Sequence, residues 1–256
     1  MTISSVAQKA PEGEARLSSG APSVEADRGA RASAGPLMDL VGWMATLSRL
    51  ASLSRFSMER LSSRESVMEH LGQVSLTALA LATECDGREP KCVSVASVVM
   101  RALVHDLEEA VTGDIARPTK HASPAARQLF EALTESAAGY LAKDLESSMP
   151  HFARSMYWHH QRAKKDKEGC VVALADILAV VTKVWEEVVL RGSGAMIRQA
   201  HTATRQLLEF QVRLDREFER GPANAFLSQV TLSALEVMRV ATERDSKWYG
   251  TKVERY

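Results

Sequence analysis

Apolar side chains recur three and four residues apart along most of this chain, beginning at Leu37. Such spacing places them on one face of an α-helix. The first of these segments carries Leu37, Leu40, Val41, Met44, Leu47 and Leu50. No segment alternates convincingly with period two, the spacing of a half-buried strand. The pattern therefore predicts an all-α fold, in which helices bury their apolar faces against one another.

Capping and turn residues divide this pattern into about eight helices. Ser66 and Glu69 have the spacing of a capping box, Gly113 suits the left-handed residue after a helix, and Ser123-Pro124 suits a helix start. We place the helices at residues 37–53, 66–84, 93–112, 123–145, 150–161, 170–191, 195–218 and 222–244, with 117–120 as a loop. The sixth helix is apolar around most of its circumference, so it should lie at the centre.

The first 36 residues differ from the rest in composition. They are rich in Ala, Ser, Gly, Glu and Pro and hold scarcely any large apolar side chains, so they cannot offset the entropy cost of becoming ordered. We expect a disordered tail over residues 1–36, one helical domain over 37–218, and a C-terminal helix with a short tail, 219–256, packed on that domain.

Charge and cysteine content exclude several classes of protein. The chain has 32 basic and 32 acidic residues, which gives no global electrostatic reason to expect nucleic acid or an anionic membrane as a partner. Three cysteines without a CxxC pair argue against a disulfide framework and a zinc knuckle. No run approaches the roughly 18 apolar residues of a membrane span, and no signal-peptide pattern begins the chain. We expect a cytoplasmic protein.

Histidines and carboxylates at three places suggest a metal site. His105-Asp106 opens a segment that also holds Glu108, Glu109 and Asp114. On a continuous helix His105 and Glu109 would share a face. His70 and Asp176 lie on other predicted helices; Asp176 alone could equally be a buried hydrogen-bonding group. Two imidazoles and two carboxylates together suit a divalent transition metal, Mn, Co or Zn, with Mg a further candidate, and leave positions for water and a substrate oxygen.

The order His, His-Asp, Asp on helices resembles that of the HD-domain metal-dependent phosphohydrolases. Local motifs are similar, in the same order, to those of the YfbR-like 5'-deoxynucleotidases, and phage dATP triphosphohydrolases of the DatZ type look similar over the same helices. The resemblance covers about Trp43 to Arg191. It rests on Arg49-Leu50, Ser54-Arg55-Phe56, residues 64–70, His105-Asp106 with Glu109, Thr112-Gly113-Asp114, Pro118 with Lys120, and residues 175–178 with Glu186-Glu187.

This resemblance implies roles for individual residues. The implied metal ligands are His70, His105, Asp106 and Asp176. Glu109 matches the family's catalytic acid or base, and Asp114 a further site carboxylate.

The resemblance also implies substrate contacts. Arg55 matches a phosphate-contacting arginine, whose planar cation suits phosphate oxygens. Phe56 stands where the nucleotidases carry a Trp that crowds the sugar 2' position. Lys120 is a candidate phosphate contact, against the alternative of a solvated loop lysine.

Three functions follow as expectations. The first is metal-dependent hydrolysis of a (deoxy)nucleotide phosphoester, as a 5'-deoxynucleotidase that releases phosphate from dNMP. The second is a dNTP triphosphohydrolase, which extra basic groups near the site would favour: Arg117, Lys120, Arg162, Lys164 and Lys165. The third is a non-catalytic nucleotide-binding protein that keeps the fold.

Other groups near the site have structural interpretations. Glu108 should point away into solvent or a salt bridge, and His159-His160 should line a pocket wall or the surface. Because the resembling nucleotidases are dimers and the helices should present more apolar surface than one subunit covers, we expect a symmetric homodimer.

Overall fold

The computed structural model describes the backbone of residues 36–253 and the side chains of residues 40–244. The expected tail, residues 1–36, lies outside this part except for Pro36, the first residue of α2. Within it the chain is helical and has no strand, so the all-α prediction is confirmed. The elements are α2 (Pro36–Ser52), α3 (Val67–Arg88), α4 (Val95–Val104), α5 (Glu109–Thr112), α6 (Arg117–Lys120), α7 (Pro124–Leu145), α8 (Pro150–Gln161), α9 (Lys167–Val184), the π-helix η1 (Trp185–Leu190), the 3₁₀-helix η2 (Gly194–Met196), α10 (Ile197–Glu217) and α11 (Pro222–Val253).

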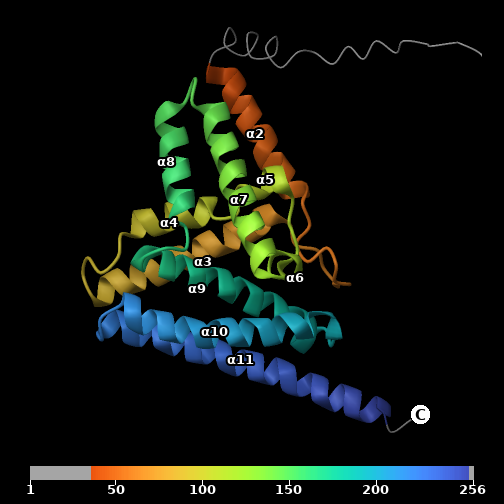
Figure 1. Ribbon diagram of the computed structural model, residues 1–256. Coiled ribbons are helices and arrows are strands. Elements are labelled where there is room, and N and C mark those ends of the chain that lie inside the picture. Colours follow the sequence, from red (N-terminus) through yellow and green to blue (C-terminus); the bar gives the residue numbers. More distant parts are fainter. Residues whose placement is uncertain (1–35, 254–256) are drawn as a thin grey trace, which may run out of the picture.

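The helices form three groups (Figure 1). In the middle lie α3, α4 and α9, which contact one another. Below them in the view, α10 and α11 run side by side, and α10 packs along α9. Above them stand α2 and the hairpin of α7 and α8. No described helix is long and apolar enough to cross a membrane.

Two apolar clusters hold these groups together, and α3 belongs to both. Val74 and Ala78 pack in the larger cluster with α4, α9, α10 and α11. Val67 and Leu71 pack in the smaller one with α2, α7 and α8. His70 lies on α3 at the boundary between the clusters and is fully buried. A polar site at such a boundary is walled by apolar side chains, which makes unpartnered polar atoms costly.

The third predicted helix is broken in two, so the expectation of one helix over 93–112 is wrong. α4 ends at Val104, and α5 begins at Glu109. Between them Leu107 N bonds to Val104 O (3.3 Å) and Glu109 N to Asp106 O (3.2 Å). These bonds span three residues and not the four of an α-helix, so the turn is tighter. His105 and Glu109 therefore do not share the face of one helix.

Other boundaries differ by less. The capping box is present, since Glu69 N donates to Ser66 Oγ (3.1 Å) and Ser66 N to Glu69 Oε2 (2.6 Å). That helix continues past the expected end at residue 84 to Arg88. Gly113 has the positive φ expected of it, +74°. The expected loop at 117–120 is the single turn α6.

The sixth predicted helix is central, as expected, and its last part is a π-helix. α9 ends at Val184, and η1 follows without a break. Glu187 lies in η1 and is 0% exposed. Its carboxylate contacts the loop between α2 and α3 and accepts hydrogen bonds from Ser62 N (2.9 Å) and Ser63 N (3.2 Å). The two ends of that loop are joined by a hydrogen bond from Arg55 N to Glu65 O (2.8 Å). The loop that carries Arg55 and Phe56 is thus held at both ends.

Candidate functional site

The turn between α4 and α5 points the His105 ring into the interior. His105 Nδ1 lies 2.8 Å from the Ala102 carbonyl oxygen. Because a carbonyl only accepts, Nδ1 carries the proton and donates, which leaves Nε2 with its lone pair. This Nε2 is buried, has no hydrogen-bond partner, and lies 3.2 Å from Asp106 Oδ2. Two electron-rich atoms so close in a buried place require a positive charge nearby, either a proton or a cation.

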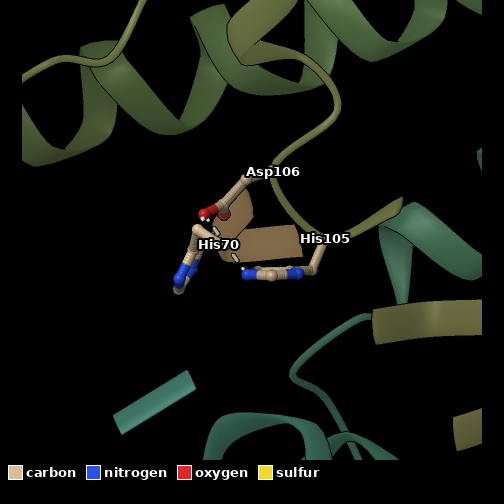
Figure 2. Close-up of side chains that lie close together, drawn as sticks. All are labelled: His70, His105 and Asp106. Atoms are coloured by element: carbon tan, nitrogen blue, oxygen red, sulfur yellow. Dashed lines mark ion pairs between the residues drawn. The ribbon is translucent and has the colours of Figure 1, made fainter. Parts of the chain in front are cut away.

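His70 reaches the same point from α3. Its Nε2 is likewise buried without a hydrogen-bond partner, 3.6 Å from Asp106 Oδ2 and 3.1 Å from Asp176 Oδ1. Its Nδ1 lies 2.6 Å from Arg55 Nη1. Burial lowers the pKa of His70, but Asp106 and Asp176 raise it by more, so the net shift is upward. Figure 2 shows His70, His105 and Asp106 converging on one small space.

Asp106 and Asp176 supply the carboxylates of this cluster. The ligand atoms of His70, His105 and Asp106 lie within 4.8 Å of one another. Asp176 Oδ1, from α9, faces His70 Nε2 and lies 4.0 Å from His105 Nε2. Burial would raise the pKa of both carboxyl groups, but neighbouring cationic groups hold it well below the usual range. Two orphaned imidazole nitrogens facing two ionised carboxylates fit a divalent metal of the N/O type.

Glu109 begins α5 and is buried, and Lys120 from α6 contacts it. The distance from Lys120 Nζ to Glu109 Oε1 is 3.2 Å. Lys120 is therefore paired with a carboxylate and is not a solvated loop lysine. Burial and the charge of Asp106 raise the pKa of Glu109 to about 8, against the opposing effect of Lys120. Half-buried Asp114 adds to that rise. The pKa of Glu109 therefore lies well above that of an exposed glutamate.

Arg55 extends from the loop between α2 and α3 and contacts Nδ1 of His70. Its Nη1 donates to Glu65 Oε1 (2.6 Å) and to His70 Nδ1. Its guanidinium lies over the Phe56 ring, 4.9 Å from the ring centre. Phe56 itself is half-buried and packs against the larger apolar cluster, with a φ of +54°. Arg55 and Phe56 thus form one stacked unit beside the histidines.

Two residues join the cluster that the motifs did not single out as site residues. Lys164 was only one of five basic candidates, and its Nζ lies 2.5 Å from Asp176 Oδ2. Glu65 is buried, bonds Arg55, and lies 3.7 Å from His70 Nδ1. A signal for Glu65 was its place next to the capping residue Ser66. Lys164 had no local signal, because its position depends on the packing of a loop.

Glu108 and His160 form a buried pair, so of the two places expected for Glu108, solvent or a salt bridge, the structure has the second. His160 Nε2 lies 2.8 Å from Glu108 Oε2, and both residues are buried. The pair joins the end of α8 to the turn that carries His105 and Asp106. His159 is half-buried.

Known structures share this fold. An HD-domain phosphohydrolase from Listeria innocua matches with a TM-score of 0.60 and 19% sequence identity, over 81% of this chain and 99% of that one. The HD phosphohydrolase DatZ of cyanophage S-2L, bound to dA and one catalytic Zn²⁺ ion, matches with a TM-score of 0.50 and 19% identity, over 75% and 95% of the two chains. The fold is that of the HD-domain phosphohydrolases.

The family is shown by sequence as well. A family model described as 5'-deoxynucleotidase YfbR-like matches residues 42–218. The chain belongs to this family and is a hydrolase. Relatives include the 5'-deoxynucleotidases of Yersinia pestis and Yersinia pseudotuberculosis, which are 28% identical over 145 residues, 57% of this chain and 73% of theirs.

Proposed function

We propose that this hydrolase is a metal-dependent 5'-deoxynucleotidase that releases inorganic phosphate from deoxynucleoside monophosphates. One observation carries the proposal: two buried, unpartnered imidazole nitrogens face two carboxylates, and Arg55, Lys120 and Lys164 contact members of the site from around it. A metal ion would satisfy the inner atoms, and a phosphate would offset the outer cations. The family's name and those of the Yersinia relatives support the monophosphate as substrate.

His70, His105, Asp106 and Asp176 would hold the metal, a divalent ion such as Mn, Co or Zn. The Zn²⁺ bound by DatZ supports a transition metal. A bound ion would polarise a phosphoryl oxygen and lower the pKa of a water molecule. To bind a metal through Nε2, His70 must carry its proton on Nδ1. Glu65 is then the natural partner for that proton, since metal-bound imidazoles usually donate to a carboxylate or carbonyl.

Hydrolysis forms a bond from a water oxygen to phosphorus and breaks the bond from phosphorus to the nucleoside oxygen, which must gain a proton. Glu109 is placed to take the proton of the water or to supply one to the leaving oxygen. Its pKa, raised to about 8 by burial and by Asp106, suits a group that exchanges a proton near neutral pH. Arg55 would offset the charge on the phosphate oxygens.

A second candidate is the dNTP triphosphohydrolase. It is favoured by the placement of the basic groups, because Lys120 contacts Glu109 and Lys164 contacts Asp176. Arg162 instead pairs with Asp166 at the surface, at 3.6 Å. Two more phosphates would need such extra cations.

Assays with a panel of dNMPs, dNTPs and their ribonucleotide counterparts, each with Mn²⁺, Co²⁺ and Zn²⁺, distinguish the three candidate functions. Release of orthophosphate from dNMP supports the proposal, and release of triphosphate from dNTP replaces it with the second candidate. Binding without any release by the metal-loaded protein would support the non-catalytic alternative and contradict both.

A further inference from the structure

Lys164 contacts the candidate metal site from a partly exposed position. Its Nζ contacts Asp176 Oδ2 at 2.5 Å, while Oδ1 of the same carboxylate faces His70 Nε2. Asp176 therefore contacts the Lys164 ammonium through Oδ2 and faces the two imidazoles through Oδ1. The side chain of Lys164 is 40% exposed and that of Asp176 23%. Both side chains of this contact are therefore partly open to solvent.

Two arginines hold the backbone of the loop that carries Lys164. Arg213 Nη2 donates to the Lys164 carbonyl (2.8 Å) and to the Asp166 carbonyl (3.3 Å). Buried Arg101 donates to the Arg162 carbonyl (3.2 Å) and pairs with the Asp166 carboxylate. Loops commonly bond water through such carbonyls. Here two arginines from α4 and α10 bind them instead.

Backbone packing adds a further restraint on the same loop. At Gly169, in the first turn of α9, a Cβ atom would lie 2.7 Å from the Lys164 carbonyl carbon. That is closer than real Cβ atoms approach, so only glycine lets the loop fold back on α9. Asp166 has a φ of +55° and accepts from Gly169 N (3.2 Å) as the N-cap of the helix. The Lys164 backbone is thereby fixed relative to Asp176, twelve residues along.

We propose that Lys164 is a substrate-binding residue, whose ammonium holds a phosphoryl oxygen of the nucleotide beside the metal. An ammonium has three donors, and Asp176 Oδ2 takes one of them, so two remain for an anion. This role rests on the proposed function, since it assumes a phosphate-bearing substrate at this site. A lysine that only neutralised Asp176 would not need its backbone fixed by two arginines and a glycine.

The test measures binding of inorganic phosphate, by calorimetry, to the protein saturated with Zn²⁺. Lys164→Met should weaken phosphate binding by about 10- to 100-fold, the range for losing a hydrogen bond to a charged group. Lys164→Arg keeps the charge and should recover most of the affinity. The control is Lys143→Met, at an exposed position on α7, which should leave the affinity within about twofold of wild type, as expected for a surface substitution.

Two outcomes would overturn the role of Lys164 in phosphate binding. One is equal phosphate affinity in wild type and Lys164→Met at saturating Zn²⁺; another is equal weakening by Lys143→Met. If Lys164→Met does not fold, Lys164→Gln replaces it, with the same expected loss. Because binding is measured without turnover, failure of the proposed nucleotidase activity remains a separate result: phosphate that binds through Lys164 to a protein that hydrolyses no nucleotide contradicts only the proposed function.

Discussion

At the scale of single residues, the ring nitrogen that carries the proton decides whether each histidine can bind a cation. His105 donates from Nδ1 to a carbonyl, so its Nε2 is free to bind a cation. His70 Nδ1 has two neighbours, the donor Arg55 and the acceptor Glu65. A metal bound at His70 Nε2 would place the ring proton on Nδ1, where Glu65 could accept it.

Asp106 Oδ2 lies within 3.6 Å of both imidazole Nε2 atoms, so its loss should remove metal and activity together. Asp106→Ala is expected to lose bound Zn²⁺ or Mn²⁺ and hydrolysis, because Asp176 is the other carboxylate within 4.0 Å of these nitrogens and Lys164 already holds one of its oxygens. Elemental analysis after dialysis measures the metal. Asp215→Ala, an exposed position on α10, is the control. Full metal content in Asp106→Ala would contradict its role as a ligand.

Glu109 should act on protons and not on the metal. Glu109→Gln is expected to keep metal content and lower kcat by about 10²- to 10⁴-fold, the usual contribution of a general acid or base. Elemental analysis and initial rates measure the two effects. Turnover within a few-fold of wild type would assign the role elsewhere, and Asp114 would be the next residue to change.

The same residue predicts a pH dependence of stability in the metal-free protein. The pKa of Glu109 rises from 4.5 to about 8 on folding, so between these values the folded state binds more protons than the unfolded state. The free energy of unfolding should therefore fall as pH rises through this window. Glu109→Gln removes this effect and should be the more stable protein at about pH 8, by on the order of a few kcal/mol, but not at about pH 4. Urea unfolding at several pH values measures the difference, and parallel curves would contradict it.

At the scale of elements, three short segments position the site: the tight turn after α4, the loop between α2 and α3, and the loop before α9. Each is held by buried polar contacts from another element. The Glu108–His160 pair holds the first, Glu187 the second, and Arg101 with Arg213 the third. Such contacts let non-helical backbone carry chemistry without losing its geometry.

Glu187 provides the test at this scale. Glu187→Ala leaves the Ser62 and Ser63 amides without their acceptor, which should lower the free energy of unfolding by about 1–3 kcal/mol. It should also raise KM, because the freed loop carries Arg55. Glu186→Ala is the matched control, since its side chain is 42% exposed, and it should change stability by less than about 0.5 kcal/mol. Denaturant unfolding and steady-state kinetics measure both, and equal effects in the two variants would contradict the role of Glu187.

At the scale of the whole molecule, exposed apolar side chains remain after the helices have packed. Among the described residues they include Leu76, Leu79, Leu208 and Val212 on α3 and α10. We predict a symmetric homodimer that covers part of this surface. Light scattering coupled to gel filtration should give twice the mass of one chain across a range of concentrations. A single-chain mass throughout would contradict the prediction.

The sequence alone determined what is local. Helical spacing, the Ser66–Glu69 capping box and the positive φ of Gly113 depend on neighbours within about one turn of helix, so they were predictable. The metal-ligand candidates were also predictable, because two histidines and two carboxylates in otherwise apolar helices are costly unless paired.

Only the tertiary structure decided where those helices break and what surrounds the ligands. The tight turn at 105–108 goes with contacts to residues far along the chain, such as His160, and the interaction of Lys164 with Asp176 needs a loop pinned by Arg101 and Arg213. Glu187 bonds amides more than 120 residues away. These contacts leave no mark in local periodicity, because their energies arise only when distant segments have packed and excluded water.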